Sequence, residues 1–302
     1  MDHIILRGDA LHLPLADRSV QCCVTSPPYF RLRDYGTEGQ IGMEETPEAY
    51  VENLIQVMRE VKRVLKDDGI LWLNLGDGFS GSGKGVGGKG TTSPKQLSNR
   101  GSYDASLPCR FSLGPKQLLG MPWRVALALQ DDGWILRSDI IWSKSNAMPE
   151  SVKDRPTRSH EYVFLLAKRT RYYYDATAIA EPSVGVTGGG FSRSYAEAQP
   201  NHGAMKLERP PETDTRNARD VWVIPTGQFR GAHYATMSLE LAKRCILAGS
   251  RKGDVVLDPF SGAGTTALAA ISLGRKAIGV DLSFEYSEMA MQRIAKAPRP
   301  LL

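Results

Sequence analysis

Long apolar runs, basic leader segments and paired cysteines are missing from this 302-residue sequence. No stretch reaches the roughly 18–20 apolar residues of a membrane helix, and no basic segment precedes a long apolar run, so we expect neither a membrane span nor a secretory signal. The four cysteines, at 22, 23, 109 and 245, form no C-x-x-C pair. We therefore expect no metal site and no disulfide framework, but reduced thiols packed as small apolar groups in a cytoplasmic protein.

Two nucleotide-binding patterns are also incomplete. The dinucleotide pattern G-x-G-x-x-G is absent, because Ala267 stands where its third glycine would be. Residues 83–90 nearly spell a phosphate-binding P-loop, but Gly90 occupies the position that needs a serine or threonine, and Pro94 interrupts the helix that should follow. These gaps argue against a nicotinamide or flavin enzyme and against a nucleoside triphosphatase.

The net charge of +5 is small, but its distribution is uneven. Residues 1–83 carry 8 basic and 13 acidic side chains, whereas residues 84–171 carry 15 basic and 7 acidic ones. A basic middle in a chain with an isoelectric point of about 9.0 favours a polyanionic partner, although many basic surfaces are only solvated.

Apolar runs of strand length alternate with segments of helical periodicity, which predicts an α/β fold. The predicted strands are 3–6, 20–25, 70–75, 134–143, 161–167, 255–258 and 277–281. The predicted helices are 47–66, 122–130, 238–247 and 265–273, the first with Thr46 as its N-cap. Residues 79–116 and 183–219 lack periodicity, so we expect one domain, 1–302, that carries two long loops.

A strand, a tight glycine turn and a helix start follow one another at residues 254–266. Gly262 and Gly264 let the backbone approach a ligand closely, and the helix start turns unpaired N–H groups toward it. The next predicted strand ends at Asp281, 23 residues after Asp258. An acidic residue about 20 positions on accepts hydrogen bonds from a ribose diol. The segment predicts an adenosine-bearing cofactor, with an ordinary strand-to-helix turn as the alternative.

The tetrapeptide Ser26-Pro27-Pro28-Tyr29 directly follows a predicted strand, at the sheet edge where α/β proteins bind ligands. Two prolines stiffen it and remove two N–H donors, which leaves acceptors and one aromatic ring. Such an edge suits a planar group with two N–H donors, namely the exocyclic amine of a nucleobase. A Pro-Pro turn with a packed tyrosine is the alternative.

Together these two segments resemble the amino-directed DNA methyltransferases, which use S-adenosylmethionine to methylate N6 of adenine or N4 of cytosine. The tetrapeptide precedes the cofactor glycines, which is the order of their β class. Shorter segments are similar too, and they are 8–10, 73–77, 137–142, 155–162 and 233–236. The resemblance runs from about residue 3 to residue 294, apart from 183–219.

The resemblance implies a mainly parallel, seven-stranded Rossmann-like sheet with one antiparallel strand, the class I methyltransferase fold in circularly permuted order. It also implies S-adenosylmethionine as the cofactor, a bacterial or phage origin, and a homodimer. Phe260 would lie near the adenine of the cofactor, and Asp281 would bind its ribose. The cofactor-binding residues implied are Asp9, Ala10, His233, Thr236, Asp258, Phe260, Gly262, Gly264, Thr265 and Asp281.

The catalytic residues implied are Ser26, Pro27, Pro28 and Tyr29. The lone pair of the target amine is delocalised into the base ring, so the amine is a poor nucleophile. If Ser26 and the Pro27 carbonyl accept its two N–H bonds, the lone pair is freed and attacks the sulfonium methyl in line, without a covalent enzyme intermediate. The base must first leave the duplex, and Tyr29 would stack on it.

Double-stranded DNA is the implied partner, with basic side chains on its phosphates. We expect the basic loop 79–116 and a target recognition region at 176–220 to recognise the DNA base sequence. The candidate DNA-binding residues are Arg31, Arg33, Lys84, Lys89, Arg100, Arg193, Asn201, Arg216 and Asn217.

The target amine stays open between two bases. Serine in the first position of the tetrapeptide is associated in this family with cytosine N4, and aspartate with adenine N6. Enzymes that carry serine there and methylate adenine also exist, as do those that methylate cytosine. Adenine methylation is the commoner bacterial modification among enzymes without a nuclease partner, and on that ground we expect N6 of adenine, with N4 of cytosine as the alternative. A non-catalytic DNA-binding module of the same fold, or the same chemistry on RNA or a protein amide, are further alternatives.

Overall fold

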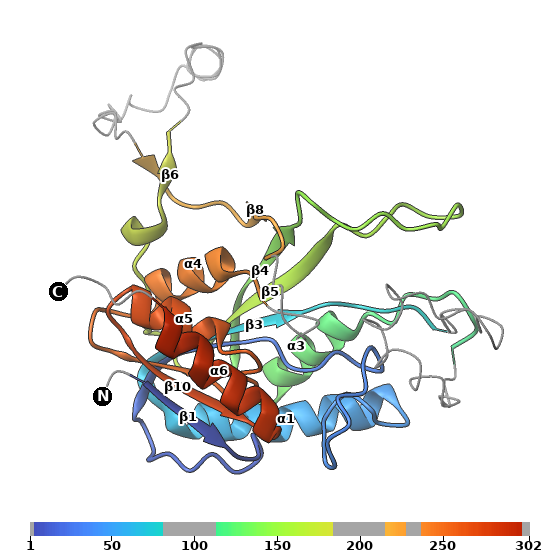
Figure 1. Cartoon of the computed structure of the whole chain (residues 1–302). Helices are drawn as coiled ribbons and strands as arrows, with labels where there is room; N and C mark the ends of the chain where they lie inside the picture. The colour runs from blue at the N-terminus through green and yellow to red at the C-terminus, as the bar shows by residue number, and fades with distance from the viewer. Residues whose placement is uncertain (1–2, 81–112, 184–214, 228–236, 298–302) are drawn as a thin grey trace, which may run out of the picture.

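The computed structural model describes residues 3–80, 113–183, 215–227 and 237–297, and an eight-stranded sheet forms its centre (Figure 1). The strands lie in the order β1-β10-β9-β2-β3-β5-β4-β8. Their bounds are β1 His3–Arg7, β2 Val20–Thr25, β3 Leu65–Leu75, β4 Ile135–Ser143, β5 His160–Ala167, β8 Val221–Val223, β9 Val255–Asp258 and β10 Lys276–Asp281. Two short strands, β6 (Glu181–Pro182) and β7 (Thr215–Arg216), form a separate antiparallel pair.

The sheet is mainly parallel, as the sequence predicts. Among the described strands, β5 runs antiparallel to both of its neighbours, β3 and β4, and the other pairs in the sheet are parallel. The sheet has one strand more than the seven expected. The additional strand, β8, is only three residues long and pairs with the end of β4, so it is too short to give a periodic signal.

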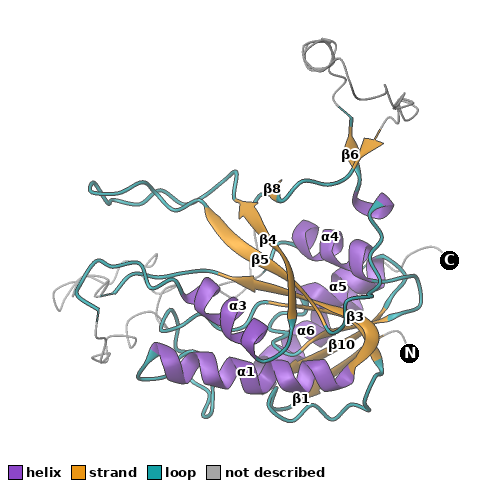
Figure 2. Cartoon of the chain, turned by 180° about the vertical axis from the view of Figure 1, so that it is seen from behind, coloured by secondary structure: helices purple, strands orange, loops and turns teal. Residues whose placement is uncertain are grey.

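Helices cover both faces of the sheet (Figure 2). Helices α1 (Pro47–Val64) and α3 (Met121–Asp131) pack together on one face. Helices α4 (Leu239–Gly249), α5 (Thr265–Ser272) and α6 (Phe284–Lys296) lie on the other, and a short 3-10 helix, η3 (Thr177–Ile179), contacts α4. None of the helices in the described part of the chain has the length and apolarity that crossing a bilayer requires.

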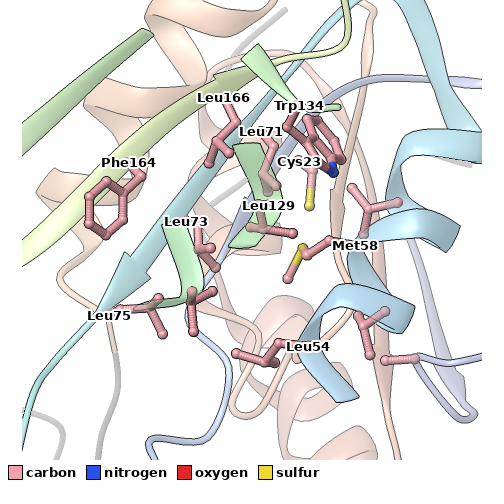
Figure 3. Packing of buried hydrophobic residues seen from close by; sticks show 14 of the residues in the cluster. Cys23, Leu54, Met58, Leu71, Leu73, Leu75, Leu129, Trp134, Phe164 and Leu166 are labelled. Atoms are coloured by element: carbon pink, nitrogen blue, oxygen red, sulfur yellow. The ribbon is translucent and has the colours of Figure 1, made fainter. Parts of the chain in front are cut away.

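Central strand β2 shows how the two cores form. All six of its residues are buried, and from Cys22 to Val24 they alternate between the faces. Cys23 points to the α1 side, where Met58 of α1 and Leu129 of α3 belong to the same cluster (Figure 3). Cys22 and Val24 belong to the cluster on the α4 and α5 side. A central strand buried on both faces reads as a near-continuous apolar run, and the sequence therefore predicts its bounds.

The predicted packing of the cysteines as small, buried groups is confirmed for the three that the structure describes. Cys22, Cys23 and Cys245 are free and buried, and burial raises the pKa of each thiol well above its usual range. Cys109 lies outside the described residues. The three thiols therefore pack as small apolar groups and are not activated as nucleophiles.

Helix α1 begins as the sequence predicts, because the Thr46 hydroxyl accepts a hydrogen bond from the Ala49 N–H over 3.2 Å. Its end differs from the prediction. The helix stops at Val64, and β3 starts at once at Leu65, whereas the sequence predicts a helix to residue 66 and a strand only from residue 70. The register of the β2–β3 pairing shifts between the Val20–Leu65 pair and the Cys22–Ile70 pair. This irregularity accommodates the additional residues at the start of β3.

Candidate active site

The neighbouring parallel strands β1, β10, β9 and β2 end at one edge of the sheet, and the segments that follow them form the candidate site. The tetrapeptide 26–29 follows β2, and the glycine turn follows β9. The Thr25 hydroxyl, at the end of β2, donates to Asp258 Oδ1, at the end of β9, over 2.7 Å. Two motifs that lie far apart in the sequence are therefore brought together.

Asp258 is buried at the centre of this edge. Its carboxylate also accepts a hydrogen bond from the Thr266 hydroxyl over 2.7 Å and from the Phe260 N–H over 3.1 Å. Burial outweighs these hydrogen bonds and raises the pKa of Asp258 to about 6. An anionic group that is short of compensating positive charge favours a cationic ligand at this position.

The glycine turn uses backbone conformations that other residues disfavour. Gly262 and Gly264 have φ of 49° and 73°. The Gly262 N–H donates to Asp281 Oδ2 over 2.8 Å, which joins the turn to the end of β10. A Cβ on Gly264 would lie 2.9 Å from the Ala290 Cβ. Gly262 therefore shapes the ligand side of the turn, and Gly264 allows α6 to pack closely behind it.

A cavity of about 950 Å³, its open mouth included, lies between these segments. Asp9, Asp258 and Asp281 line it, and none of the described residues in its wall is a lysine, arginine or histidine. Three carboxylates without a cation do not suit a phosphate-bearing nucleotide. They suit S-adenosylmethionine, which carries a sulfonium and an ammonium group as well as a ribose diol, so the residues present fit this cofactor.

Aromatic rings complete the wall of the cavity. Phe260 lies in it, together with Tyr35 and Tyr286, whose ring centroids are 6.1 Å apart in an edge-on arrangement. Tyr35 is held in the loop after the tetrapeptide, where the Gln40 side chain accepts a hydrogen bond from the Tyr35 N–H over 2.8 Å. Sequence analysis did not find Tyr35 or Tyr286, because they stand in segments without a recognisable motif.

Most of the predicted cofactor residues meet at this cavity. Those in its wall are Asp9, Ala10, Asp258, Phe260, Gly262, Thr265 and Asp281. Gly264 lies behind the wall, as described above. His233 and Thr236 lie outside the described residues.

The tetrapeptide stands at the same wall. Ser26 and Pro28 line the cavity, and Pro27 is buried. Tyr50 of α1 donates its hydroxyl hydrogen to the Pro28 carbonyl over 2.8 Å, which fixes the turn from the α1 side. The Tyr29 ring packs on the backbone of Gly76, because a Cβ there would lie 2.5 Å from Tyr29 Cε2. Neither Tyr50 nor Gly76 was recognised as a site residue from sequence.

Behind the tetrapeptide, buried polar groups surround the Tyr29 hydroxyl. It donates to Glu161 Oε2 over 2.6 Å, and Asn74 donates to the same oxygen over 3.1 Å. Lys144 forms an ion pair with the other oxygen of Glu161. The segments that contain Asn74 and Glu161 resemble the family in sequence, but the sequence alone gives these two residues no role.

The four described candidates for DNA contact lie in two places. Arg31 and Arg33 stand in the loop after the tetrapeptide, and Arg31 has φ of 49° and donates its N–H to the Gly42 carbonyl over 2.6 Å. Arg216 is 3.7 Å from Glu181, which also pairs with Arg219 and Arg244, while Asn217 is exposed. The remaining candidates, Lys84, Lys89, Arg100, Arg193 and Asn201, lie outside the described residues.

A permuted, mainly parallel sheet with an acidic, glycine-lined cavity at its carboxyl edge defines a class I methyltransferase that uses S-adenosylmethionine. The family model of the DNA methylases matches residues 20–292. The chain therefore belongs to this family, the DNA methyltransferases that methylate adenine N6 or cytosine N4.

Curated relatives are similar in sequence to this protein over nearly its whole length. The Type II methyltransferase M.SmaI of Serratia marcescens is 45% identical over 97% of this chain and 90% of its own length. The Type II methyltransferase M.XycI of Xanthomonas campestris pv. cyanopsidis is 44% identical over 96% of this chain and 87% of its own. The chain is thus a DNA methyltransferase of the Type II, restriction–modification kind.

Solved structures show the same fold. TTHA0409 of Thermus thermophilus, complexed with S-adenosyl-L-methionine, is similar with a TM-score of 0.59 and 26% identity, over 97% of this chain and 93% of that one. The cytosine-N4-specific PvuII DNA methyltransferase is similar with a TM-score of 0.64 and 18% identity, over 100% of this chain and 89% of that one.

Proposed function

We propose that this enzyme transfers a methyl group from S-adenosylmethionine to N4 of cytosine in double-stranded DNA. The expectation of adenine rests on enzymes that act without a nuclease partner, and this ground does not apply to a chain whose relatives are Type II methyltransferases. The indicator that remains is Ser26, since serine at this position is associated with cytosine N4. The presence of Ser26 at the wall of the acidic cavity carries the proposal.

Different residues of the cavity would bind different parts of the cofactor. S-Adenosylmethionine supplies the methyl group on a positively charged sulfur. Asp281 would accept hydrogen bonds from the ribose, Phe260 would pack near the adenine, and the Gly262 turn would lie along the methionine end. Asp258 would lower the energy of the positive charge, because opposite charges attract strongly in a buried site.

The tetrapeptide would receive the extruded base. Ser26 and the Pro27 carbonyl would accept the two N–H bonds of the amine and draw its nitrogen toward sp³ geometry. Alignment of the amine with the methyl group would supply most of the acceleration, up to about 7–11 kcal/mol for a well-oriented pair. Tyr29 would stack on the base and offset part of the cost of its extrusion, roughly a few kcal/mol.

The decisive experiment is mass spectrometry of nucleosides from DNA that the purified enzyme has modified. N4-methylcytosine is the expected product, and N6-methyladenine would shift the target to adenine. Ser26→Ala should slow methylation strongly, to a residual rate, while the affinity for S-adenosylmethionine persists. A wild-type protein that binds DNA and the cofactor but methylates neither base would instead support the non-catalytic module.

We also propose that the enzyme acts as a homodimer on duplex DNA, with phosphate contacts from its basic middle segment. DNA binding should weaken steeply between about 50 and 200 mM salt, because each neutralised phosphate releases a counterion. Light scattering of the free and the DNA-bound protein tests the dimer, and a monomer in both states refutes it.

A further inference from the structure

A chain of hydrogen bonds leads from the cavity wall into the sheet. Ser26 Oγ, at the wall, donates to Tyr29 Oη over 3.3 Å, and Tyr29 Oη donates to Glu161 Oε2 over 2.6 Å. Ser26 lines the cavity, whereas Tyr29 and Glu161 do not. The Tyr29 hydroxyl and Glu161, which lie behind Ser26, can therefore influence the reaction only through Ser26 or through the shape of the tetrapeptide.

Three neighbouring strands fix Glu161 at the inner end of this chain. Glu161 lies on β5, and Asn74 of β3 donates to its Oε2 and to the Tyr162 carbonyl, each over 3.1 Å. Lys144, which directly follows β4, forms an ion pair with Oε1. The side chains of Lys144 and Glu161 are only 21% and 14% exposed, so solvent screens this pair weakly.

The chain has a defined direction. An ionised carboxylate can only accept hydrogen bonds, so the Tyr29 hydrogen points to Glu161. Burial and the charge of Glu161 raise the pKa of Tyr29 well above its usual range, so the hydroxyl stays protonated at neutral pH. Its oxygen is then free to accept the hydrogen of Ser26.

This direction matters for the amine. A serine hydroxyl that is free to rotate can also donate to the amine nitrogen, which would occupy the lone pair that must attack the methyl group. With its hydrogen committed to Tyr29, Ser26 presents only oxygen lone pairs to the cavity. Successive hydrogen bonds also polarise one another, so a carboxylate at the far end makes Ser26 a stronger acceptor.

We propose that Glu161 is a positioning residue for methyl transfer: through the Tyr29 hydroxyl it directs the Ser26 hydrogen away from the cavity and makes Ser26 an acceptor for the substrate amine. The inference rests on the proposed function in one respect, which is that a base amine meets Ser26. The inference holds whether the target base is cytosine or adenine.

Single-turnover methylation with saturating cofactor and DNA tests it in Tyr29→Phe, Glu161→Gln and the double variant. Each single change should slow transfer by about 10-fold or more, the size expected for one hydrogen bond, and leave the affinity for S-adenosylmethionine unchanged. The double variant should be no slower than the slower single one, because both changes act on Ser26 through the same chain: Tyr29→Phe removes the hydroxyl that links it, and Glu161→Gln removes the charge at its end. Tyr162→Phe in β5 and Glu60→Gln in α1, where Glu60 pairs with Arg63, are matched changes outside the chain and should keep the wild-type rate.

Effects that multiply in the double variant, or a Glu161→Gln enzyme with the wild-type rate, would overturn the inference. If Glu161→Gln does not fold, as judged by melting and cofactor binding, the same logic applies to Ser26→Ala and Tyr29→Phe. Tyr29→Phe should then slow the wild type but not the residual activity of Ser26→Ala, and an equal slowing in both overturns the inference. A wild type that methylates no DNA refutes the proposed function instead.

Discussion

The Thr25 hydroxyl donates a hydrogen bond to Asp258 over 2.7 Å, although 233 positions separate the two residues in the sequence. Thr25 directly precedes the tetrapeptide, and Asp258 directly precedes the glycine turn. Strands β2 and β9 are neighbours in the sheet, so this contact sets the distance between the base-binding and the cofactor-binding segments. Methyl transfer needs that distance to be fixed, because small misplacements of reacting groups are costly.

Thr25→Val should therefore destabilise the protein and weaken cofactor binding together. Valine has the same shape but cannot donate, so the buried carboxylate loses one of its partners at a cost of about 1–3 kcal/mol. Urea unfolding and calorimetric titration with S-adenosylmethionine measure the two effects. Thr25→Ser keeps the donor and is the matched control, and equal stability of the two variants would contradict the prediction.

Much of the fold could be predicted because its strands are short apolar runs between turn residues. The bounds of β2 and β9 agree with the prediction, and the strand that carries Asp281 was placed within one residue. Helix α6 was missed, although Ser283 caps it and accepts a hydrogen bond from the Tyr286 N–H over 3.4 Å. The three residues of β8 depend on pairing with β4 and give no local signal.

Only those parts of the site that belong to a local sequence motif could be predicted. The tetrapeptide and the glycine turn have local backbone requirements, which prolines and glycines satisfy visibly in the sequence. Glu161 and Gly76 are different, because their importance comes from contact with Tyr29 across strands. Such contacts depend on the register of β3 and β5, which one sequence does not specify.

Ionisation of Asp258 should lower the stability of the protein without cofactor. Burial raises its pKa to about 6, so the native state binds a proton more tightly than the unfolded chain does. This contribution is fully present below the unfolded pKa and is lost as the pH rises through 6, by about 3 kcal/mol at ~1.4 kcal/mol per pKa unit. Cofactor affinity should rise over the same pH range, because the carboxylate that forms attracts a cation.

Asp258→Asn separates this contribution from those of other groups, including Asp281, whose pKa burial also raises. The difference in unfolding free energy between wild type and variant should change between about pH 4 and pH 7, in the direction that makes the wild type relatively less stable at the higher pH. Urea titrations at several pH values measure it. A difference that does not vary with pH would show that Asp258 titrates normally.

Two glycines at positive φ offer a test of close packing in the turn. Gly264 and Gly253 have φ of 73° and 83°, so alanine at either position incurs a similar backbone strain of roughly 1–2 kcal/mol. A Cβ at 264 would also meet Ala290 at 2.9 Å, whereas nothing lies within 4 Å of one at 253. Gly264→Ala should lose more stability, by about 1–3 kcal/mol, and should weaken cofactor binding. Equal melting temperatures for the two variants would refute this account.

Gly76 and Gly78 provide a matched pair for the tetrapeptide. A Cβ on Gly76 would lie 2.5 Å from the Tyr29 ring, whereas a Cβ on Gly78 would lie 3.6 Å from Leu119, which is an ordinary contact. Gly76→Ala should therefore push the Tyr29 ring away and slow methyl transfer by about 100-fold, the effect of displacing a reacting geometry by about 1 Å. Cofactor affinity should persist, because Gly76 does not line the cavity. Single-turnover rates for both variants measure the effect, and a Gly76→Ala enzyme as fast as Gly78→Ala would show that the position of the Tyr29 ring is unimportant for the reaction.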